Sequence, residues 1–346
     1  MSPARRPSPR RWLRRGTPET SLESQLLEIT PEDRRWVTAK YDDSVPLPEG
    51  AERDLSEDSP RLRELRLAYA GLDLPVCDRS QWRDEAVASF LDLRYFRGDS
   101  LITWHYRELP RITRLKYFIY TLYVRGRDEL GLLSRLEEDG AFGCWTFSYP
   151  GYGRVSRDLL QSVNELSFLE RRLGLSKRER ISVLDVGAGY GRLAHRMTEA
   201  FAGVGDYCCV DAIPESTFLS EYYLRHRGAT PPARVVPLDR LDQELEPGSF
   251  DLAVAVHIFS ECTLSAIAWW VARLRALEVP RLLVVPREPT ELLSVEPDWT
   301  RHDYAPVLEQ AGYRLEAREP VVDDPAFAQQ LGLEDHYHLF ALDEGA

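Results

Sequence analysis

The fold is decided by a glycine-rich stretch in the second half of the chain, Val183-Leu-Asp-Val-Gly-Ala-Gly-Tyr-Gly-Arg-Leu-Ala194. An apolar run expected to form a buried strand leads into Gly187, Gly189 and Gly191, and a helix is expected to begin near Arg192. Glycine lets the backbone turn tightly and lets a ligand approach closely, because it has no Cβ. Tight turns also need glycine for packing alone, so the residues around the loop decide whether it binds a ligand.

An acidic residue follows the loop at an informative distance. Asp211 lies twenty residues beyond Gly191, at the end of the next expected strand. A carboxylate in that place can accept hydrogen bonds from both ribose hydroxyls of a nucleoside. The loop and Asp211 together predict a site for a ligand that contains a nucleoside.

The residues on either side of the loop predict an α/β fold. Five short apolar or β-branched runs alternate with helical stretches: Ile181–Val186, Tyr207–Val210, Arg234–Pro237, Asp251–Val256 and Leu282–Val285. This alternation indicates βαβ units and a parallel sheet with helices on both faces. Two later runs, Tyr313–Arg318 and His336–Leu342, alternate with period two and predict an antiparallel hairpin at the sheet edge. We expect a seven-stranded, mostly parallel, Rossmann-like sheet that ends in the strand His336–Leu342.

The chain divides into three parts by composition. Residues 1–55 are expected to be a disordered basic leader and an irregular entry segment, and residues 56–150 a helical, aromatic-rich cap. Residues 151–346 are expected to form the α/β domain. Within the cap, Ser80 is expected to cap one helix, and another helix is expected over Ile112–Val124.

Composition excludes several classes of function. The net charge is −12, and six arginines lie in the acid-free leader 1–15, so the rest of the chain carries −18. Such a body repels phosphate backbones, so nucleic acid is not the expected partner. No apolar run is long enough to span a membrane. The five cysteines show no C-x-x-C spacing, which favours a reducing compartment and a cytoplasmic protein.

The charge near the loop indicates which kind of nucleoside-containing ligand binds there. Asp185 lies two residues before the first glycine, where it would repel a pyrophosphate but suits the amino group and sulfonium of S-adenosylmethionine. The pattern D-x-G-x-G-x-G also resembles the first motif of class I methyltransferases, whereas nicotinamide-binding folds read G-x-G-x-x-G. The resemblance implies these cofactor-binding residues: Asp185, Gly187, Ala188, Gly189, Tyr190, Gly191, Asp211, Ala212, Asp239 and His257. For Asp239, a role as a turn or capping residue is an equal alternative.

Sequence beyond the cofactor core resembles a narrower family. The segments that carry this resemblance are Ser156–Leu169, Val210–Ser216, Glu221–Leu224, Tyr304–Tyr313 and His336–Phe340. They resemble a bacterial family of sugar O-methyltransferases encoded in antibiotic gene clusters, over roughly residues 55 to 342. This resemblance implies methyl transfer from S-adenosylmethionine to a sugar hydroxyl of a glycosylated natural product or its precursor. An O-methyltransferase for a non-sugar small molecule and a non-catalytic protein that binds S-adenosylmethionine stay as alternatives.

The candidate catalytic residues follow the fourth expected strand. In open α/β sheets, ligands bind beyond the carboxyl ends of the strands, and the strand Asp251–Val256 ends at His257. An alcohol oxygen needs a base before it attacks a methyl group, and imidazole titrates near neutrality. His257 is therefore the first candidate base, with Glu261 orienting the imidazole or holding a sugar hydroxyl. The alternative is that His257 packs beside the cofactor and Glu261 starts a helix.

Aromatic residues of the cap are candidates for acceptor binding, because aromatic faces stack on the C–H faces of sugars. With one later histidine, the candidates are Trp104, Tyr106, Trp145, Tyr149, Tyr152 and His302. Packing in the core of the cap is the alternative for the aromatic residues. A second base or metal ligands are sought among His302, Asp303, His336 and His338, and surface or sheet-edge positions are their alternative. Magnesium and the oligomeric state are left open.

Overall fold

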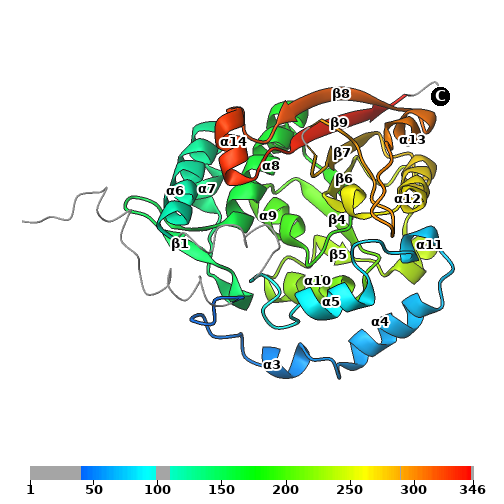
Figure 1. Cartoon of the computed structure of the whole chain (residues 1–346), viewed down its shortest axis with the longest axis horizontal. Coiled ribbons are helices and arrows are strands. Elements are labelled where there is room, and N and C mark those ends of the chain that lie inside the picture. Colours follow the sequence, from blue (N-terminus) through cyan, green and yellow to red (C-terminus); the bar gives the residue numbers. More distant parts are fainter. Residues whose placement is uncertain (1–39, 99–109, 289, 344–346) are drawn as a thin grey trace, which may run out of the picture.

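A computed structural model describes residues 40–98, 110–288 and 290–343 (Figure 1). Its central sheet has seven strands in the order β5-β4-β3-β6-β7-β9-β8. The strands are β3 Ile181–Val186, β4 Val204–Val210, β5 Ala233–Val235, β6 Leu252–Val256, β7 Arg281–Val285, β8 Tyr313–Pro320 and β9 His336–Leu342. The five strands β3 to β7 are parallel to one another, and β9 is antiparallel to both of its neighbours. The predicted seven-stranded, mostly parallel sheet is confirmed.

The order of the last two strands corrects one prediction. The sheet does not end in β9, because β9 lies between β7 and β8, and β8 forms the edge. Burial gives the physical reason. The middle of β9, Tyr337 to Phe340, is buried on both sides, whereas Arg314, Leu315 and Glu316 of β8 are exposed. The strand with more buried residues takes the interior place.

Helices cover both faces of the sheet (Figure 1). One face carries α8 Arg157–Leu173 and α9 Arg192–Ala200, and the other carries α12 Leu264–Ala276 and α13 Ala305–Gln310. α10 Pro214–His226 packs on β4 and β5. Short helices complete the domain: α11 Leu241–Glu244, α14 Pro325–Leu331, and the 3₁₀ turns η6 Leu238–Arg240 and η7 Ile258–Glu261.

The described part of the N-terminal segment begins with short helices: α3 Ala51–Asp54, α4 Pro60–Ala70, the 3₁₀ turn η2 Pro75–Cys77 and α5 Asp84–Phe90. α4 runs along α10 (Figure 1), and η2 packs on α12. The prediction that Ser80 caps a helix is wrong, because α5 starts four residues later and its N-cap is Arg83. The hydroxyl of Ser80 instead donates to the backbone oxygen of Glu261, at 2.8 Å. The Ser80 hydroxyl, which the local pattern assigns to a helix cap, therefore makes a long-range contact instead.

The rest of the N-terminal part packs against α8. It contains α6 Pro110–Arg127, α7 Leu132–Arg135 and the antiparallel hairpin of β1 Thr146–Ser148 and β2 Arg154–Ser156. α6 spans the predicted helix Ile112–Val124, which is confirmed. The hairpin was not predicted, since each of its strands is only three residues long. No helix in the described ranges has the length and apolar character of a membrane span.

Buried charges join the N-terminal part to the α/β domain. The Glu138 carboxylate accepts hydrogen bonds from Arg97 at 2.8 Å and from Arg196 of α9 at 3.3 Å. The Ser156 hydroxyl donates to the same carboxylate at 2.6 Å. One hydrophobic core runs through both parts. The division into a cap over 56–150 and a domain over 151–346 stays a prediction.

Candidate active site

The loop after β3 is built so that only glycine fits two of its positions. Gly187 and Gly191 have φ of 71° and 84°, in the left-handed region that side chains other than glycine rarely adopt. A Cβ on Gly187 would lie 2.6 Å from the side chain of Ile258, and one on Gly191 would lie 2.9 Å from the Ser220 hydroxyl oxygen. The loop therefore packs directly against η7 and α10, and both the backbone angles and the close contacts require glycine.

Asp211 is tied to this loop by hydrogen bonds. One carboxylate oxygen accepts the backbone N–H of Gly189 and the other accepts that of Ile213, each at 2.9 Å. The side chain is buried, and burial raises the pKa of Asp211 to about 7 in spite of these two donors. A carboxylate fixed in this way holds its remaining lone pairs in defined directions.

A cavity of 220 Å³ lies where the loop and Asp211 meet the carboxyl ends of the strands. The α/β domain lines it with the loop, with Asp211, with the start of α10 and with Val256, Ile258 and Glu261. The N-terminal segment supplies the opposite wall, which consists of Trp82, Phe90, Leu91 and Phe96. Sequence reasoning missed these four residues as site residues, because nothing in their local spacing connects them to a loop a hundred residues later.

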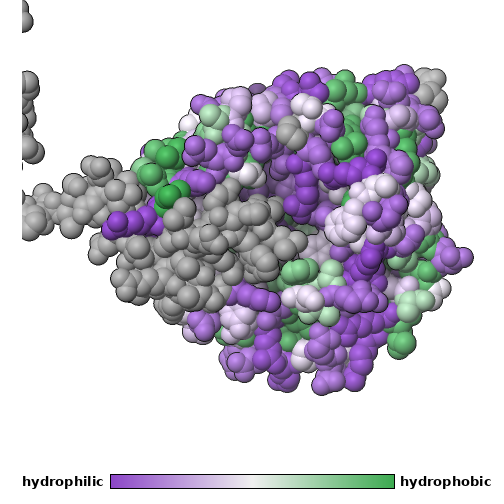
Figure 2. Space-filling view, viewed as in Figure 1, coloured by the Kyte–Doolittle hydropathy of each residue, from purple (hydrophilic) through white to green (hydrophobic). Residues whose placement is uncertain are grey.

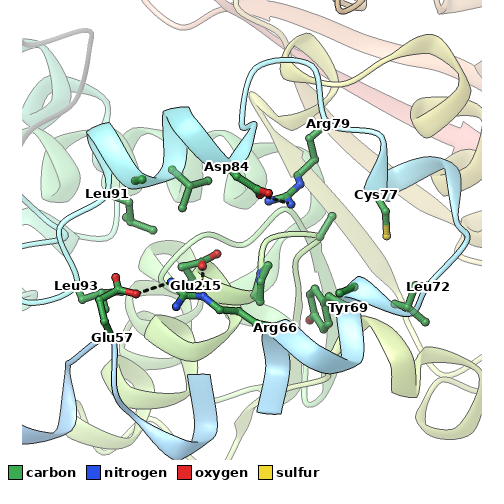
Figure 3. Close-up of a pocket in the computed structure, with 15 residues that line it drawn as sticks. Glu57, Arg66, Tyr69, Leu72, Cys77, Arg79, Asp84, Leu91, Leu93 and Glu215 are labelled. Atoms are coloured by element: carbon green, nitrogen blue, oxygen red, sulfur yellow. Dashed lines mark hydrogen bonds and ion pairs between the residues drawn. The ribbon is translucent and has the colours of Figure 1, made fainter. Parts of the chain in front are cut away.

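A larger cavity of 630 Å³ adjoins the first one (Figure 3). Leu91 lines both cavities, and Ala212 lines the larger one while its neighbours Asp211 and Ile213 line the smaller. In the larger cavity, Arg66 forms ion pairs with Glu57 and Glu215, each at 2.7 Å. These three charged side chains are thus paired with one another in the wall of the larger cavity. Most of the other residues that line it are apolar.

Asp185 lies deeper than the sequence predicts for a cofactor contact. It is buried in β3, and the hydroxyl of Tyr207 donates to its carboxylate at 2.9 Å. Burial raises the pKa of Asp185 to about 7, although Tyr207 and the charge of Arg192 act in the opposite direction. Asp185 does not line either of the two cavities described above. Its contact with the cofactor stays a prediction.

The other predicted cofactor residues lie at different distances from the cavity. Ala188 and Tyr190 belong to the loop, and the Tyr190 ring lines the smaller cavity. The hydroxyl of Tyr190 donates to Asp158 of α8, which anchors the loop from behind. Asp239 is exposed in η6, where the neighbouring Leu238 N–H donates to the Tyr69 hydroxyl at 2.8 Å. Contact between Asp239 and an adenine ring stays a prediction.

The two predicted catalytic residues have separate partners. The Glu261 carboxylate accepts the indole N–H of Trp82 at 2.6 Å and the Nε–H of Arg287 at 3.0 Å. The imidazole Nε2 of His257 lies 3.1 Å from Oδ2 of Asp335. Glu261 therefore faces the cavity between Trp82 and Arg287, and the carboxylate beside the imidazole belongs to Asp335. No local pattern in the sequence points to Arg287 or Asp335. They reach Glu261 and His257 only through the order of the strands in the sheet.

The backbone at His257 is unusual for a residue other than glycine. Its φ is 66°, in the left-handed region, and its N–H donates to the Val285 oxygen at 2.8 Å. Such backbone angles are costly and occur often at functional sites. Val256 and Ile258, on either side of His257, both line the smaller cavity. His257 itself is not among the residues that line either cavity, and its Nε2 contacts Asp335 instead.

The aromatic candidates for acceptor binding that fall within the described residues do not line either of the two cavities. Trp104 and Tyr106 fall outside the described residues. Trp145 and Tyr149 are buried, and the Tyr149 hydroxyl donates to the Arg114 backbone oxygen at 2.8 Å. The rings of Tyr149 and Tyr152 pack on Phe118 of α6. Their role in binding an acceptor stays a prediction.

The remaining histidines do not assemble a metal site. His302 and Asp303 are exposed, in the segment that pairs Leu293 with Asp303. His338 is buried in β9, and burial lowers its pKa to about 4. Within the described ranges, no group of three or more His, Cys, Asp or Glu side chains is arranged to hold a metal ion. Magnesium dependence stays open.

Comparisons with known proteins concern the fold alone. No protein-family model and no curated protein sequence matches the chain. The structure is similar to that of the [4+2]-cyclase SpnF, with 14% identity and a TM-score of 0.41 over 65% of this chain and 94% of that chain. It is also similar to magnesium protoporphyrin IX methyltransferase from Synechocystis, with 12% identity and a TM-score of 0.40 over 66% and 97%. A SAM-dependent methyltransferase from Aquifex aeolicus gives 18% identity and a TM-score of 0.38 over 51% and 88%. These sequence identities and TM-scores support no conclusion about function.

Proposed function

We propose that the protein is a methyltransferase that uses S-adenosylmethionine. One observation carries the proposal: the buried Asp211 carboxylate is bonded to the glycine loop at the wall of a cavity that lies beyond the carboxyl ends of parallel strands. A carboxylate there accepts the two hydroxyls of a ribose. The loop leaves room for a ligand at Gly189, where an added Cβ would meet no atom within 4 Å.

The charge at the site favours a cationic nucleoside over a dinucleotide. Glu261 and Asp211 both line the smaller cavity, and Asp185 lies buried just behind the loop. Glu261 is already paired with Arg287, so the charge that a ligand meets comes from Asp211 and Asp185. In their charged forms these carboxylates disfavour a pyrophosphate and attract a sulfonium and an ammonium group. This supports S-adenosylmethionine, with its positively charged sulfur, as the cofactor.

We propose that the acceptor is a hydroxyl group, and that it belongs to a sugar of a glycosylated small molecule. The oxygen assignment is supported by His257, which follows β6 between two residues that line the smaller cavity and which is paired with a carboxylate. The sugar assignment is supported by the family resemblance of the sequence. When bound, the cofactor supplies the methyl group. His257 takes the proton of the hydroxyl, and Trp82 and Glu261 form part of the wall against which the acceptor is held.

The cofactor assignment is tested by calorimetry on the whole chain. S-adenosylmethionine is expected to bind with micromolar affinity, and Asp211→Ala is expected to weaken it about tenfold or more, because two hydrogen bonds to a charged group are lost. The matched control is Asp242→Ala, which removes an exposed acid that is paired with Arg273. Binding of NAD without binding of S-adenosylmethionine would contradict the proposal.

The acceptor class is tested by transfer of a labelled methyl group. Matched pairs of small molecules, each with and without its sugar, are incubated with the protein and labelled S-adenosylmethionine. Label is expected on the glycosylated member of a pair, in an ether that resists mild base, since an ester would be cleaved. Label on the sugar-free members alone would favour a non-sugar acceptor. Binding without transfer to any compound would favour a protein that holds the cofactor but does no chemistry.

A further inference from the structure

We propose that Asp335 is a positioning residue that orients the imidazole of His257 for proton transfer. The inference rests on the proposed function, in which His257 takes the proton of the acceptor hydroxyl. It replaces Glu261 as the orienting group, since Glu261 is bonded to Trp82 and Arg287.

The strand order brings the two residues together. His257 follows the carboxyl end of β6, and Asp335 directly precedes β9. Because β9 is antiparallel to β7, its first residues lie beside the carboxyl ends of β6 and β7, and Val284 pairs with His338. Oδ2 of Asp335 is 3.1 Å from Nε2 of His257, and the two side chains are only 14% and 17% exposed. A pair with so little solvent contact has a defined geometry.

The backbone on both sides of the pair is also fixed. The N–H of His257 donates to Val285 of β7, and the left-handed φ of His257 sets the direction of its side chain. The backbone oxygen of Asp335 accepts the N–H of Val321 at 2.9 Å. Neither side chain therefore depends on a mobile loop for its position, as a pre-organised base and its partner require.

The charged groups around the pair come from three places in the sheet. Arg287 follows β7 and interacts with Glu261, Asp335 and Glu288. Glu261 belongs to η7, after β6, and His336 is the first residue of β9. Arg287 thus places a positive charge between the acid of the cavity wall and the acid beside His257.

The contact selects the tautomer of the imidazole. A carboxylate accepts only, so Nε2 carries the hydrogen that is donated to Asp335, and Nδ1 keeps the lone pair. In the transfer, the acceptor oxygen forms its bond to the methyl carbon while the bond from sulfur to that carbon breaks. The hydroxyl proton passes to Nδ1, and the Asp335 carboxylate stabilises the imidazolium that results. The transfer needs no reactant other than the acceptor and the cofactor.

Nuclear magnetic resonance of protein labelled with ¹⁵N-histidine tests the inference without an acceptor. The His257 signals are identified by their loss in His257→Gln. In the unmodified protein, the neutral ring is expected to show the tautomer with hydrogen on Nε2. In Asp335→Asn, the neutral ring is expected to lose this single tautomer and to show a mixture, because an amide presents both a donor and an acceptor to the imidazole. Asp335→Glu keeps a carboxylate and is expected to keep the hydrogen on Nε2.

The controls separate this inference from the proposed function. Glu334→Gln changes the neighbouring exposed acid and is expected to leave the tautomer of His257 unchanged. S-adenosylmethionine binding by calorimetry is expected to be the same in Asp335→Asn and the unmodified protein. A ring with hydrogen on Nδ1 in the unmodified protein, or a tautomer that Asp335→Asn leaves unchanged, would overturn the inference even if the cofactor binds. If the unmodified protein does not bind S-adenosylmethionine, the proposed function is overturned instead.

Discussion

Asp211 shows how one side chain can serve both the fold and the ligand. Its two oxygens accept backbone N–H groups from the glycine loop and from the start of α10. The hydrogen bonds close the loop onto the second strand. The same carboxylate lines the cavity, where its other lone pairs can accept hydrogen bonds from a ligand.

The pKa of Asp211 predicts that cofactor binding depends on pH. Burial raises this pKa to about 7, so below neutrality the carboxyl is protonated and accepts fewer hydrogen bonds. S-adenosylmethionine affinity is expected to rise with pH up to about 7 and then level off, with a slope of at most tenfold per unit below that point. Calorimetry between pH 5.5 and 8.5, a range of about three units around this pKa, measures it. An affinity that falls as pH rises would contradict the prediction.

Gly187 is expected to tolerate no side chain. In Gly187→Ala, the left-handed backbone costs about 1–2 kcal/mol, and the new Cβ also displaces Ile258, which lies 2.6 Å away. The matched control is Gly151→Ala, where φ is 78° but no atom lies within 4 Å. Urea unfolding should show a larger loss of unfolding free energy for Gly187→Ala. Equal losses would mean that the contact with Ile258 relaxes freely.

At the scale of elements, the segment over residues 80–96 closes the smaller cavity. Ser80 and Trp82 bond to the backbone and side chain of Glu261 in η7, and Phe90, Leu91 and Phe96 add apolar wall. A segment far from the glycine loop in sequence thus forms half of the site. The carboxyl edge of the sheet supplies the other half.

Trp82 is expected to report cofactor binding by its fluorescence. Its indole lines the cavity, so a ligand there changes its surroundings and its emission. Titration with S-adenosylmethionine should change tryptophan emission, and Trp82→Phe should lose most of that change. Trp299→Phe is the control, because Trp299 is 70% exposed and lies outside the lining. If both variants respond like the unmodified protein, the ligand binds elsewhere.

The strands could be predicted from sequence, and the walls of the site could not. Runs such as Ile181–Val186 are short, apolar or β-branched, and alternate with helical stretches, and they form strands close to the predicted bounds. The glycine loop and Asp211 were found because their spacing is local. Trp82 and Asp335 take their roles from packing between elements 80 to 180 residues apart, which leaves no local pattern.

At the scale of the whole molecule, the N-terminal part and the α/β domain share buried charges. Glu138 lies between Arg97 and Arg196, and all three side chains are buried. Burial alone would raise the pKa of Glu138, but the two arginines outweigh it and hold the pKa at about 2. The carboxylate therefore stabilises the folded state above about pH 4.5, and this contribution is lost as pH falls toward 2.

Glu138→Gln is expected to destabilise the protein by about 3–5 kcal/mol, because it removes the one fully buried carboxylate that Arg97 and Arg196 share and leaves them with more exposed acids. The loss should be largest above pH 4.5 and shrink in acid. Urea unfolding followed by circular dichroism and by tryptophan emission should give one coincident transition, since the charge links both parts. Asp54→Asn, in the exposed pair with Arg53, is the control and should cost about 1 kcal/mol or less. Two separate transitions in the unmodified protein would show that the parts unfold independently.

The shared carboxylate of Glu138 also limits how such a protein can be recombined. A chimera that takes its N-terminal part from one enzyme and its glycine loop from another must carry a matching acid and two matching arginines across the junction. A fragment that begins at α8 would lose the buried carboxylate of Glu138 and leave Arg196 with the more exposed Glu199 alone of its two acids. Changes of acceptor specificity by exchange of whole segments are therefore constrained, and single substitutions in the cavity wall are the more accessible route to a new acceptor.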